Sequence, residues 1–591
     1  MFKVIACLLL AAVAQATTYH VATTGNDSND GLTTGTAWKT LQKGANTVNP
    51  DDVVQVAAGT YSGSVIFNRA GTLGHQIVFK PEPGVSYPIL DGSSIPGGTY
   101  FIRFQGAGGS YITLQGFKIQ SFSSTSVLGC VVIDGASQGV VIDGNKVTGC
   151  SKQGIITNTS GSTAHKLQVT NNEVYSNTGG GISLYIFSGG YAFIANNLVH
   201  DNVGTGNWDG IQAGSSDGTP SYVVIRNNVV YGNGVGTTGA DQIDLGGHAF
   251  GDFYLAENNT ISGPGGDFKC QQGFGGTTII CRHNLVQNTG MTNYEYPSPV
   301  KIYNNTIYNA GHAWQIYNST VTPVPGLSFG TGGYSLWFIN NALLANGNYI
   351  VFVNQSPYDT AWVDLRTSSV NMRHNAYWPT AAVGKGIAAN PTTHATGFTH
   401  YNFSQHSTGA AQFANWQNAS GAGASGYFDK QDVGSIWIDP NTALGSIVDG
   451  SFVPVGGSPL LNQADTFTTT TAGGVATVTV PVVDAHWFFD GWGWSVFGTA
   501  DSVKVGSNSP VLISSINYTT NVITLTSPIT FNSGDAVSLG ETDIGYAQSG
   551  ATTTTSSSST VTTTSSTSTS TTTITIPAGA IRGFTCNCVI K

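Results

Sequence analysis

A short segment that recurs through the middle of the chain limits what this sequence can fold into. Each copy has an asparagine followed two positions later by an apolar or aromatic residue, as in GNKV, NNEV, NNLV, NNTI and HNAY. Their spacing runs from 21 residues between Asn284 and Asn305 to 36 between Asn305 and Asn341, which is typical of structural repeats whose loops differ in length. The aligned asparagines are Asn145, Asn172, Asn197, Asn228, Asn259, Asn284, Asn305, Asn341 and Asn375.

Each repeat also contains a second β-rich stretch, such as GIITN, GISLY or DQIDLG, and glycine-rich connections join the two stretches. Neither stretch can bury its apolar side chains alone. Stacking successive coils joins the inward Ile, Val and Leu residues into one column, while backbone groups pair with the coils above and below. The repeats therefore predict an all-β fold, a right-handed parallel β-helix, in which stacked asparagine side chains hydrogen-bond from coil to coil.

Composition divides the rest of the chain. Residues 1–16 carry one basic residue, an apolar run too short to span a bilayer and a small-residue cleavage pattern, which predicts a signal peptide and a secreted protein. We expect the β-helix over residues 17–400, with a short helix around Thr40 to Ala45 covering its first coil. No later stretch is long and apolar enough to predict a membrane span.

The C-terminal third has a different character. We expect residues 401–550 to close the helix and to carry a small inserted β-module, whose HWFFDGWGW stretch either packs into a core or offers exposed aromatic rings to sugar. Residues 551–573 are almost entirely Ser and Thr, a composition that cannot build a core and predicts a disordered linker. Residues 574–591 form a C-terminal tail of unspecific character.

Charge and cysteine content narrow the partners. The chain has 31 acidic residues against 21 Lys and Arg, a balance that argues against nucleic-acid binding and requires any acidic ligand to be held locally. We expect a monomer. Removal of the signal peptide leaves six cysteines, which either form bridges such as Cys130–Cys150 and Cys270–Cys281 or remain buried thiols. None has the paired spacing of a zinc site.

Alignment on the asparagines brings unusual residues together. Asp209 lies 19 residues before Asn228 and Asp241 lies 18 before Asn259, so these two carboxylates should stack on adjacent coils. Gln212, Asp244 and Lys269 fall into a second column on the same strand face, because the residues between them alternate inward. Three carboxylates and one amine should therefore meet in a small exterior patch.

Such a patch has a chemical purpose. Like charges on coils about 4.8 Å apart repel unless a cation neutralises them. Calcium accepts several oxygen ligands in loose geometry, so Asp209, Asp241 and Asp244 are candidate ligands. A cation one coil away favours the neutral form of the Lys269 amine, which could then remove the C5 proton of a uronic acid whose carboxylate the metal holds. Elimination of the 4-linked sugar would follow.

A family resemblance points the same way. WDGIQAG, ADQIDLG and DFKCQQ, in this order on successive coils, resemble the motifs of polysaccharide lyase family 9, the pectate lyases with a parallel β-helix, most clearly over roughly residues 18 to 290. The resemblance implies that Asp209, Asp241 and Asp244 bind calcium and that Lys269 is the catalytic base. Ala240 stands where the family has another aspartate, and Asp267 on the next coil is a candidate replacement.

Other interpretations remain open. Arg282 and His283, one coil further on, either bind substrate or belong to turn packing. A glycoside hydrolase on the same scaffold could use Asp241 and Asp244, but Lys269 would have no part in it. A C5-epimerase would share the proton abstraction, and a non-catalytic surface adhesin would need only the rod. The favoured prediction is a lyase that acts on an acidic polysaccharide such as pectate.

Overall fold

The computed structural model describes the middle of the chain almost continuously and the C-terminal third in one piece. Described are residues 16–158, 166–186, 189–204, 209–215, 221–235, 240–246, 252–270, 278–295, 300–310, 312–318, 336–344, 349–355, 370–379, 387–389, 411, 414 and 434–549. The predicted signal peptide up to residue 15, the Ser/Thr linker and the C-terminal tail lie outside these ranges. Within them, no helix is long and apolar enough to cross a membrane.

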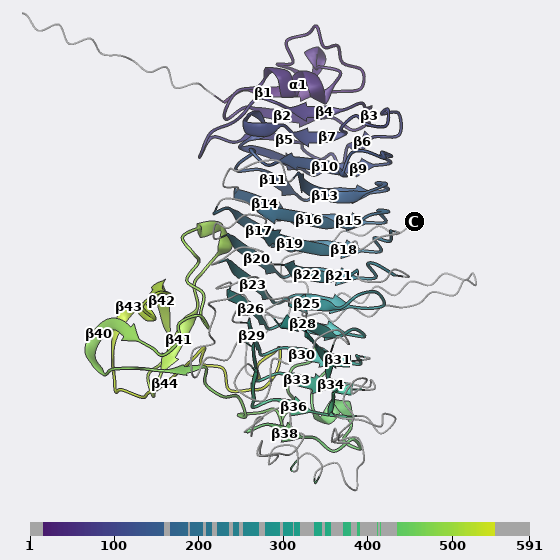
Figure 1. The fold of residues 1–591 in the computed structure, drawn as a ribbon. Coiled ribbons are helices and arrows are strands. Elements are labelled where there is room, and N and C mark those ends of the chain that lie inside the picture. The colour runs from purple at the N-terminus through teal and green to yellow at the C-terminus, as the bar shows by residue number, and fades with distance from the viewer. Residues whose placement is uncertain are drawn as a thin grey trace, which may run out of the picture.

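Three long parallel sheets form the body of the molecule, and each coil contributes one strand to each sheet (Figure 1). Sheet A contains β1 (Thr18–Val21), β2 (Val53–Val56), β5 (Ile77–Pro81), β8 (Ile112–Gln115), β11 (Val141–Asp143), β14 (Lys166–Thr170), β17 (Tyr191–Ala195), β20 (Tyr222–Arg226), β23 (Phe253–Glu257), β26 (Thr278–Arg282), β29 (Val300–Tyr303), β32 (Leu336–Ile339) and β35 (Val370–Arg373).

Sheet B follows sheet A across the asparagine turn of each coil. It contains β3 (Thr60–Ser62), β6 (Ile89–Asp91), β9 (Lys118–Gln120), β12 (Lys146–Thr148), β15 (Glu173–Tyr175), β18 (Leu198–His200), β21 (Val229–Tyr231), β24 (Thr260–Ser262), β27 (Leu285–Gln287), β30 (Thr306–Tyr308), β33 (Ala342–Leu344), β36 (Ala376–Tyr377) and β38 (Ile436–Trp437). The last of these strands comes from the segment predicted to close the helix.

Sheet C completes each coil. It contains β4 (Val65–Phe67), β7 (Ile102–Phe104), β10 (Gly129–Asp134), β13 (Gln153–Asn158), β16 (Ile182–Ile186), β19 (Ile211–Ser215), β22 (Ile243–Gly246), β25 (Phe268–Cys270), β28 (Met291–Glu295), β31 (His312–Asn318), β34 (Tyr349–Gln355) and β37 (Ile387–Ala389). The fold is a right-handed parallel β-helix, as the repeats predicted, and helix α1 (Leu41–Thr47) lies at its N-terminal end (Figure 1).

Asparagine stacks hold the coils in register. In the predicted ladder, the backbone N–H and Nδ2 of Asn145 both donate to Oδ1 of Asn172, and the pattern continues to Asn375. The residue before each ladder asparagine has the left-handed backbone, with φ of 57° at Asn227 and 53° at His283. Adjacent positions therefore divide the work, because one makes the turn and the next links the coils.

A second ladder was not predicted. At the turn between sheets B and C, Asn177 donates to Asn202, Asn202 to Asn233, and Asn233 to Oε1 of Gln242. Gln242 donates back to the backbone oxygen of Asn233 at 3.0 Å. This ladder fixes the backbone beside Asp241 and so orients one of the predicted metal ligands.

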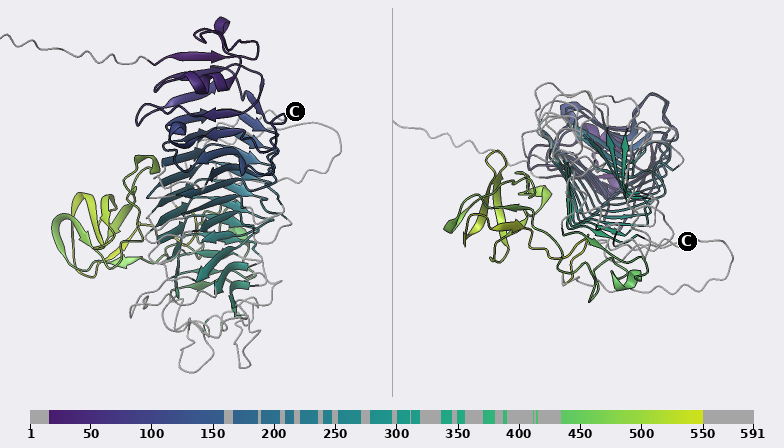
Figure 2. Two further views of the ribbon diagram at one scale, coloured as in Figure 1. Left: turned by 45° about the horizontal axis from the view of Figure 1, so that its top comes forward. Right: turned by 60° about the horizontal axis from the view of Figure 1, so that its bottom comes forward.

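The C-terminal module is a six-stranded antiparallel sheet beside sheet A (Figures 1 and 2). Trp487, Phe488 and Phe489 are buried in a cluster that also contains Val224 and Tyr303 of sheet A, so the HWFFDGWGW stretch packs into a core. The strands are β39 (Thr468–Thr469), β40 (Gly474–Pro481), β41 (Ser502–Val505), β42 (Val511–Asn517), β43 (Val522–Phe531) and β44 (Ala536–Ser538). Because the module covers sheet A, sheet C is not the face that it occupies.

Two disulfides lie in the β-helix. Cys130 pairs with Cys150, and Cys270 pairs with Cys281, which is the bridged alternative of the sequence analysis. The second bridge joins strand β25, which carries Lys269, to β26 of sheet A. It therefore ties the strand with the predicted base to the opposite wall of the core.

Candidate functional site

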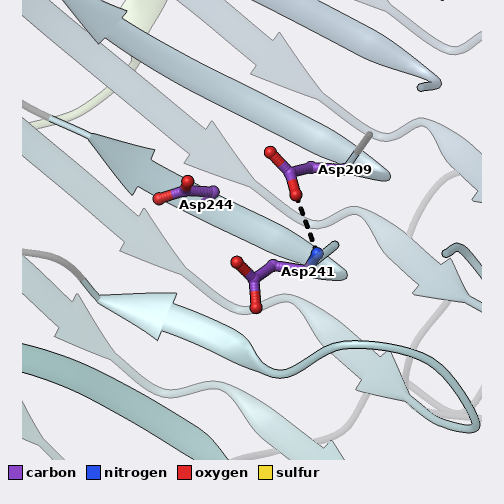
Figure 3. A group of neighbouring side chains, drawn as sticks. All are labelled: Asp209, Asp241 and Asp244. Atoms are coloured by element: carbon purple, nitrogen blue, oxygen red, sulfur yellow. Dashed lines mark hydrogen bonds between the residues drawn. The ribbon is translucent and has the colours of Figure 1, made fainter. Parts of the chain in front are cut away.

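The three predicted ligands meet at the start of two neighbouring strands of sheet C (Figure 3). Asp209 and Asp241 precede β19 and β22, and the backbone N–H of Asp241 donates to Oδ1 of Asp209 at 2.7 Å. Asp244 lies three residues further along β22, on the outer face. One carboxylate oxygen of each aspartate lies within 4.8 Å of the others, so the predicted stacking is realised in space.

Lys269 completes the cluster from the next coil. It pairs with Asp244 in the ladder between β22 and β25, as the register predicted. Its Nζ lies 3.3 Å from Oδ2 of Asp241 and 3.5 Å from Oδ2 of Asp244, and its side chain is 13% exposed. The amine therefore bridges two of the three carboxylates while it retains access to solvent.

Burial and mutual repulsion make the carboxylates poor anions in the absence of a cation. Desolvation, followed by the charges of Asp244 and Asp241, raises the pKa of Asp209 to about 8. Desolvation also raises the pKa of Asp241 to about 7, against the opposing effect of Lys269, and Asp244 and Asp267 add to the rise. One ammonium group does not balance this negative charge.

The oxygen atoms fit a hard cation. Oδ2 of Asp209 is buried and has no hydrogen-bond partner among the described residues, although a buried carboxylate oxygen normally has one. Three carboxylates without histidine or cysteine form the donor set that calcium or magnesium prefers, and calcium tolerates their irregular arrangement better. Asp209, Asp241 and Asp244 are therefore the residues that would hold such an ion.

Asp267 does not replace the missing family aspartate at Ala240. It stacks below Asp241, because its backbone oxygen accepts from the N–H of Gln242. Its carboxylate, however, turns to the following coil and accepts from Thr289 Oγ1 at 3.1 Å, from the N–H of Gly290 at 3.3 Å and from Thr292 Oγ1 at 2.5 Å. Both oxygens are already used, so Asp267 acts on the cluster only through its charge.

Arg282 and His283 do not join the cluster either. Arg282 lies on sheet A, where its 3% exposed side chain donates to Glu257 at 2.7 Å and makes two bonds of 2.7 Å to Asp501 of the module. His283 Nε2 lies 2.8 Å from Glu541. The structure thus corrects the substrate-binding alternative for both residues, because they hold the C-terminal segment against sheet A.

Three residues beside the cluster escaped the sequence analysis. The Tyr185 hydroxyl donates to Oε1 of Gln212 at 2.8 Å, and Oγ of Ser183 lies 3.1 Å from the same oxygen. Burial, with the charges of Asp244 and Asp209, raises the pKa of Tyr185, which places its hydroxyl within electrostatic range of the carboxylates. Neutral residues gave no charge signal in the sequence. The register did place Gln212 beside Asp244.

Known proteins resemble the chain mainly in fold. The family model described as a right-handed beta helix region matches residues 100–242, and no curated protein matches the sequence. XylC, solved with xylose, aligns at 14% identity and a TM-score of 0.40, over 64% of this chain and 87% of its own. Pectate lyase Pel9A aligns at 16% and 0.38, over 78% and 95%. An alginate lyase from Paenibacillus sp. str. FPU-7 aligns at 17% and 0.29, over 56% and 94%.

Proposed function

We propose that the chain is a polysaccharide lyase that cleaves an acidic, uronic-acid-containing polysaccharide by β-elimination. Lys269 would be the base, and Asp209, Asp241 and Asp244 would hold calcium. The observation that carries the proposal is the position of the Lys269 amine, 3.3 Å and 3.5 Å from two of three clustered carboxylates on an open sheet face. The two disulfides support action in an oxidising environment outside the cytoplasm.

The reaction would use few protein groups. The lone pair of Lys269 Nζ takes the C5 proton of a uronate, the electrons of that C–H bond form a C4–C5 double bond, and the bond from C4 to the linking oxygen breaks. The leaving oxygen then takes a proton. When bound, a cation would hold and polarise the substrate carboxylate and favour the neutral form of the amine. The two asparagine ladders and the disulfide at Cys270 keep β22 and β25 in register, so that base and ligands stay aligned.

Distances within the cluster favour elimination over hydrolysis. Glycoside hydrolases keep their two carboxyl groups about 5 to 9.5 Å apart so that a sugar or a water fits between them. Here one oxygen from each aspartate lies within 4.8 Å of the others, and Lys269 bridges Asp241 and Asp244. A C5-epimerase shares the first step and is separated by its product, which contains no double bond.

The test compares the purified protein with a Lys269→Ala variant on polygalacturonate, alginate and uronate-containing heteropolymers, with calcium and then with chelator. Ultraviolet absorbance follows the unsaturated product. We expect a calcium-dependent rise that is reduced by at least about a thousandfold in the variant, because removal of a catalytic base usually costs about this factor. Lys166→Ala, which changes an exposed lysine on sheet A, is the matched control and should behave as wild type. Equal rates in both variants would refute the assigned base, and no product on any uronate would refute the lyase.

A further inference from the structure

The outer face of sheet C continues from the carboxylate cluster toward the N-terminus as a neutral polar surface. Ser183, Gln212 and Asp244 occupy the same position on β16, β19 and β22. Tyr185 lies two residues beyond Ser183 and extends along the sheet to Gln212. The hydroxyls of Tyr185 and Ser183 and the amide of Gln212 thus gather within one to two coils of the cluster.

Two glycines leave room beside the Tyr185 ring. Tyr185, Gly214 and Gly246 share one register position on consecutive strands. A Cβ at Gly214 would lie 2.3 Å from the backbone oxygen of Gly246 and 3.7 Å from Cδ1 of Tyr185. Position 214 therefore has to be glycine, and its lack of a side chain leaves the strand floor bare beside a partly exposed aromatic ring. A ring wall with a few fixed polar groups is how proteins hold sugars and similar ligands.

Positive charge is scarce on this face. The only Lys and Arg residues between positions 153 and 300 are Lys166, Arg226, Lys269 and Arg282. Lys166, Arg226 and Arg282 belong to strands of sheet A, where the two arginines pair with Glu257. Lys269 alone lies on sheet C, and two aspartates engage it.

A second uronate next to the cluster would therefore meet unfavourable surroundings. Its carboxylate would lie close to Asp209 and Asp244, whose charges already act on Tyr185. Recognition of a carboxylate generally uses an arginine or lysine with good geometry, and an unpaired charge in a partly buried site is costly. Hydroxyl groups, by contrast, find both donors and acceptors on Ser183, Gln212 and Tyr185.

We propose that Tyr185, Gln212 and Ser183 form a subsite for a neutral sugar residue next to the carboxylate cluster, so that the polymer bound here carries an uncharged sugar beside a uronate. The assignment of the uronate to the cluster rests on the proposed function. The neutral subsite itself rests on the contacts of Tyr185 and on the charges of sheet C. It predicts a preference for alternating heteropolymers over pure polyuronates.

Binding tests the subsite separately from catalysis. In a Lys269→Ala background with calcium, calorimetry compares an oligosaccharide of alternating galacturonate and rhamnose with an oligogalacturonate of equal length. We expect about tenfold tighter binding of the alternating oligosaccharide, a preference that Tyr185→Ala abolishes and Tyr185→Phe reduces by roughly threefold. Tyr231→Ala, which removes a ring from the outer face of sheet B, should leave the preference unchanged.

Each outcome is decisive. Equal or tighter binding of the oligogalacturonate would overturn the proposal, and so would an unchanged preference in folded Tyr185→Ala or, if that variant fails to fold, in Tyr185→Phe. Turnover by the wild-type protein is measured on polymers of the same two kinds. If neither polymer is cleaved, the proposed elimination fails, while the binding preference still decides the subsite.

Discussion

Cation binding at the aspartate cluster should be coupled to protons. Without a cation, the pKa of Asp209 is about 8 and that of Asp241 about 7, so at pH 6 both groups are mostly protonated. A cation that binds the carboxylates must displace these protons. Lowering the pH from 8 to 6 should therefore weaken binding by about tenfold if only a group with a pKa of 7 releases its proton, and by about fiftyfold if the group has a pKa of 8.

Calorimetry of calcium binding at the two pH values, in buffers of different ionisation enthalpy, measures both the affinity and the number of protons released. We expect about one proton per ion at pH 7. Asp209→Asn keeps an oxygen that can accept from the N–H of Asp241, but it removes a charge, so it should weaken binding and reduce the pH dependence. Asp201→Asn alters an exposed carboxylate and is the control. Affinities that agree within about twofold at pH 6 and pH 8, with no proton release, would refute the reasoning.

Two further predictions concern stability. Glu257→Gln leaves Arg226 and Arg282 without their shared buried anion and should lower the free energy of unfolding at pH 7 by about 3 to 5 kcal/mol in urea titrations, and a loss under about 1 kcal/mol would contradict this. Since the pKa of Glu257 is lowered to about 2, its contribution is present above pH 4.5 and fades as the pH falls toward 2. Asn228→Ala interrupts the ladder between Asn197 and Asn259 and should cost about 2 to 4 kcal/mol by the same titration, whereas an exposed asparagine such as Asn26 should tolerate alanine with little loss.

Repetition made much of the fold predictable. Because each ladder asparagine sits at one height on its coil, counting back from it placed Asp209 with Asp241 and Asp244 with Lys269, and the structure has this register. The count works only where the segment between residue and ladder keeps its length. The cluster satisfies this condition, since its offsets differ by one residue from coil to coil.

What could not be predicted depends on contacts between distant segments. Arg282 and Asp501 are separated by 219 residues, and nothing in the repeat indicates that a module returns to cover sheet A. Arg282 therefore looked like an exposed residue near the site, although it is buried under the module. Tyr185 was missed for another reason, since an aromatic residue on a strand is usually explained by packing and only its bond to Gln212 marks it.

The module also changes how the rod can come apart. In a solenoid each coil contacts only its neighbours, so opening can start at any point and spread one coil at a time. Here a single compact body touches Tyr191 on β17, Phe253 on β23 and Trp337 on β32, and it forms ion pairs with Arg282 and Lys301 between them. Those coils cannot separate individually unless the module is stripped from all of them. The splinted segment includes the coils that carry the cluster, so we expect amide hydrogens there to exchange together, while the N-terminal coils exchange independently.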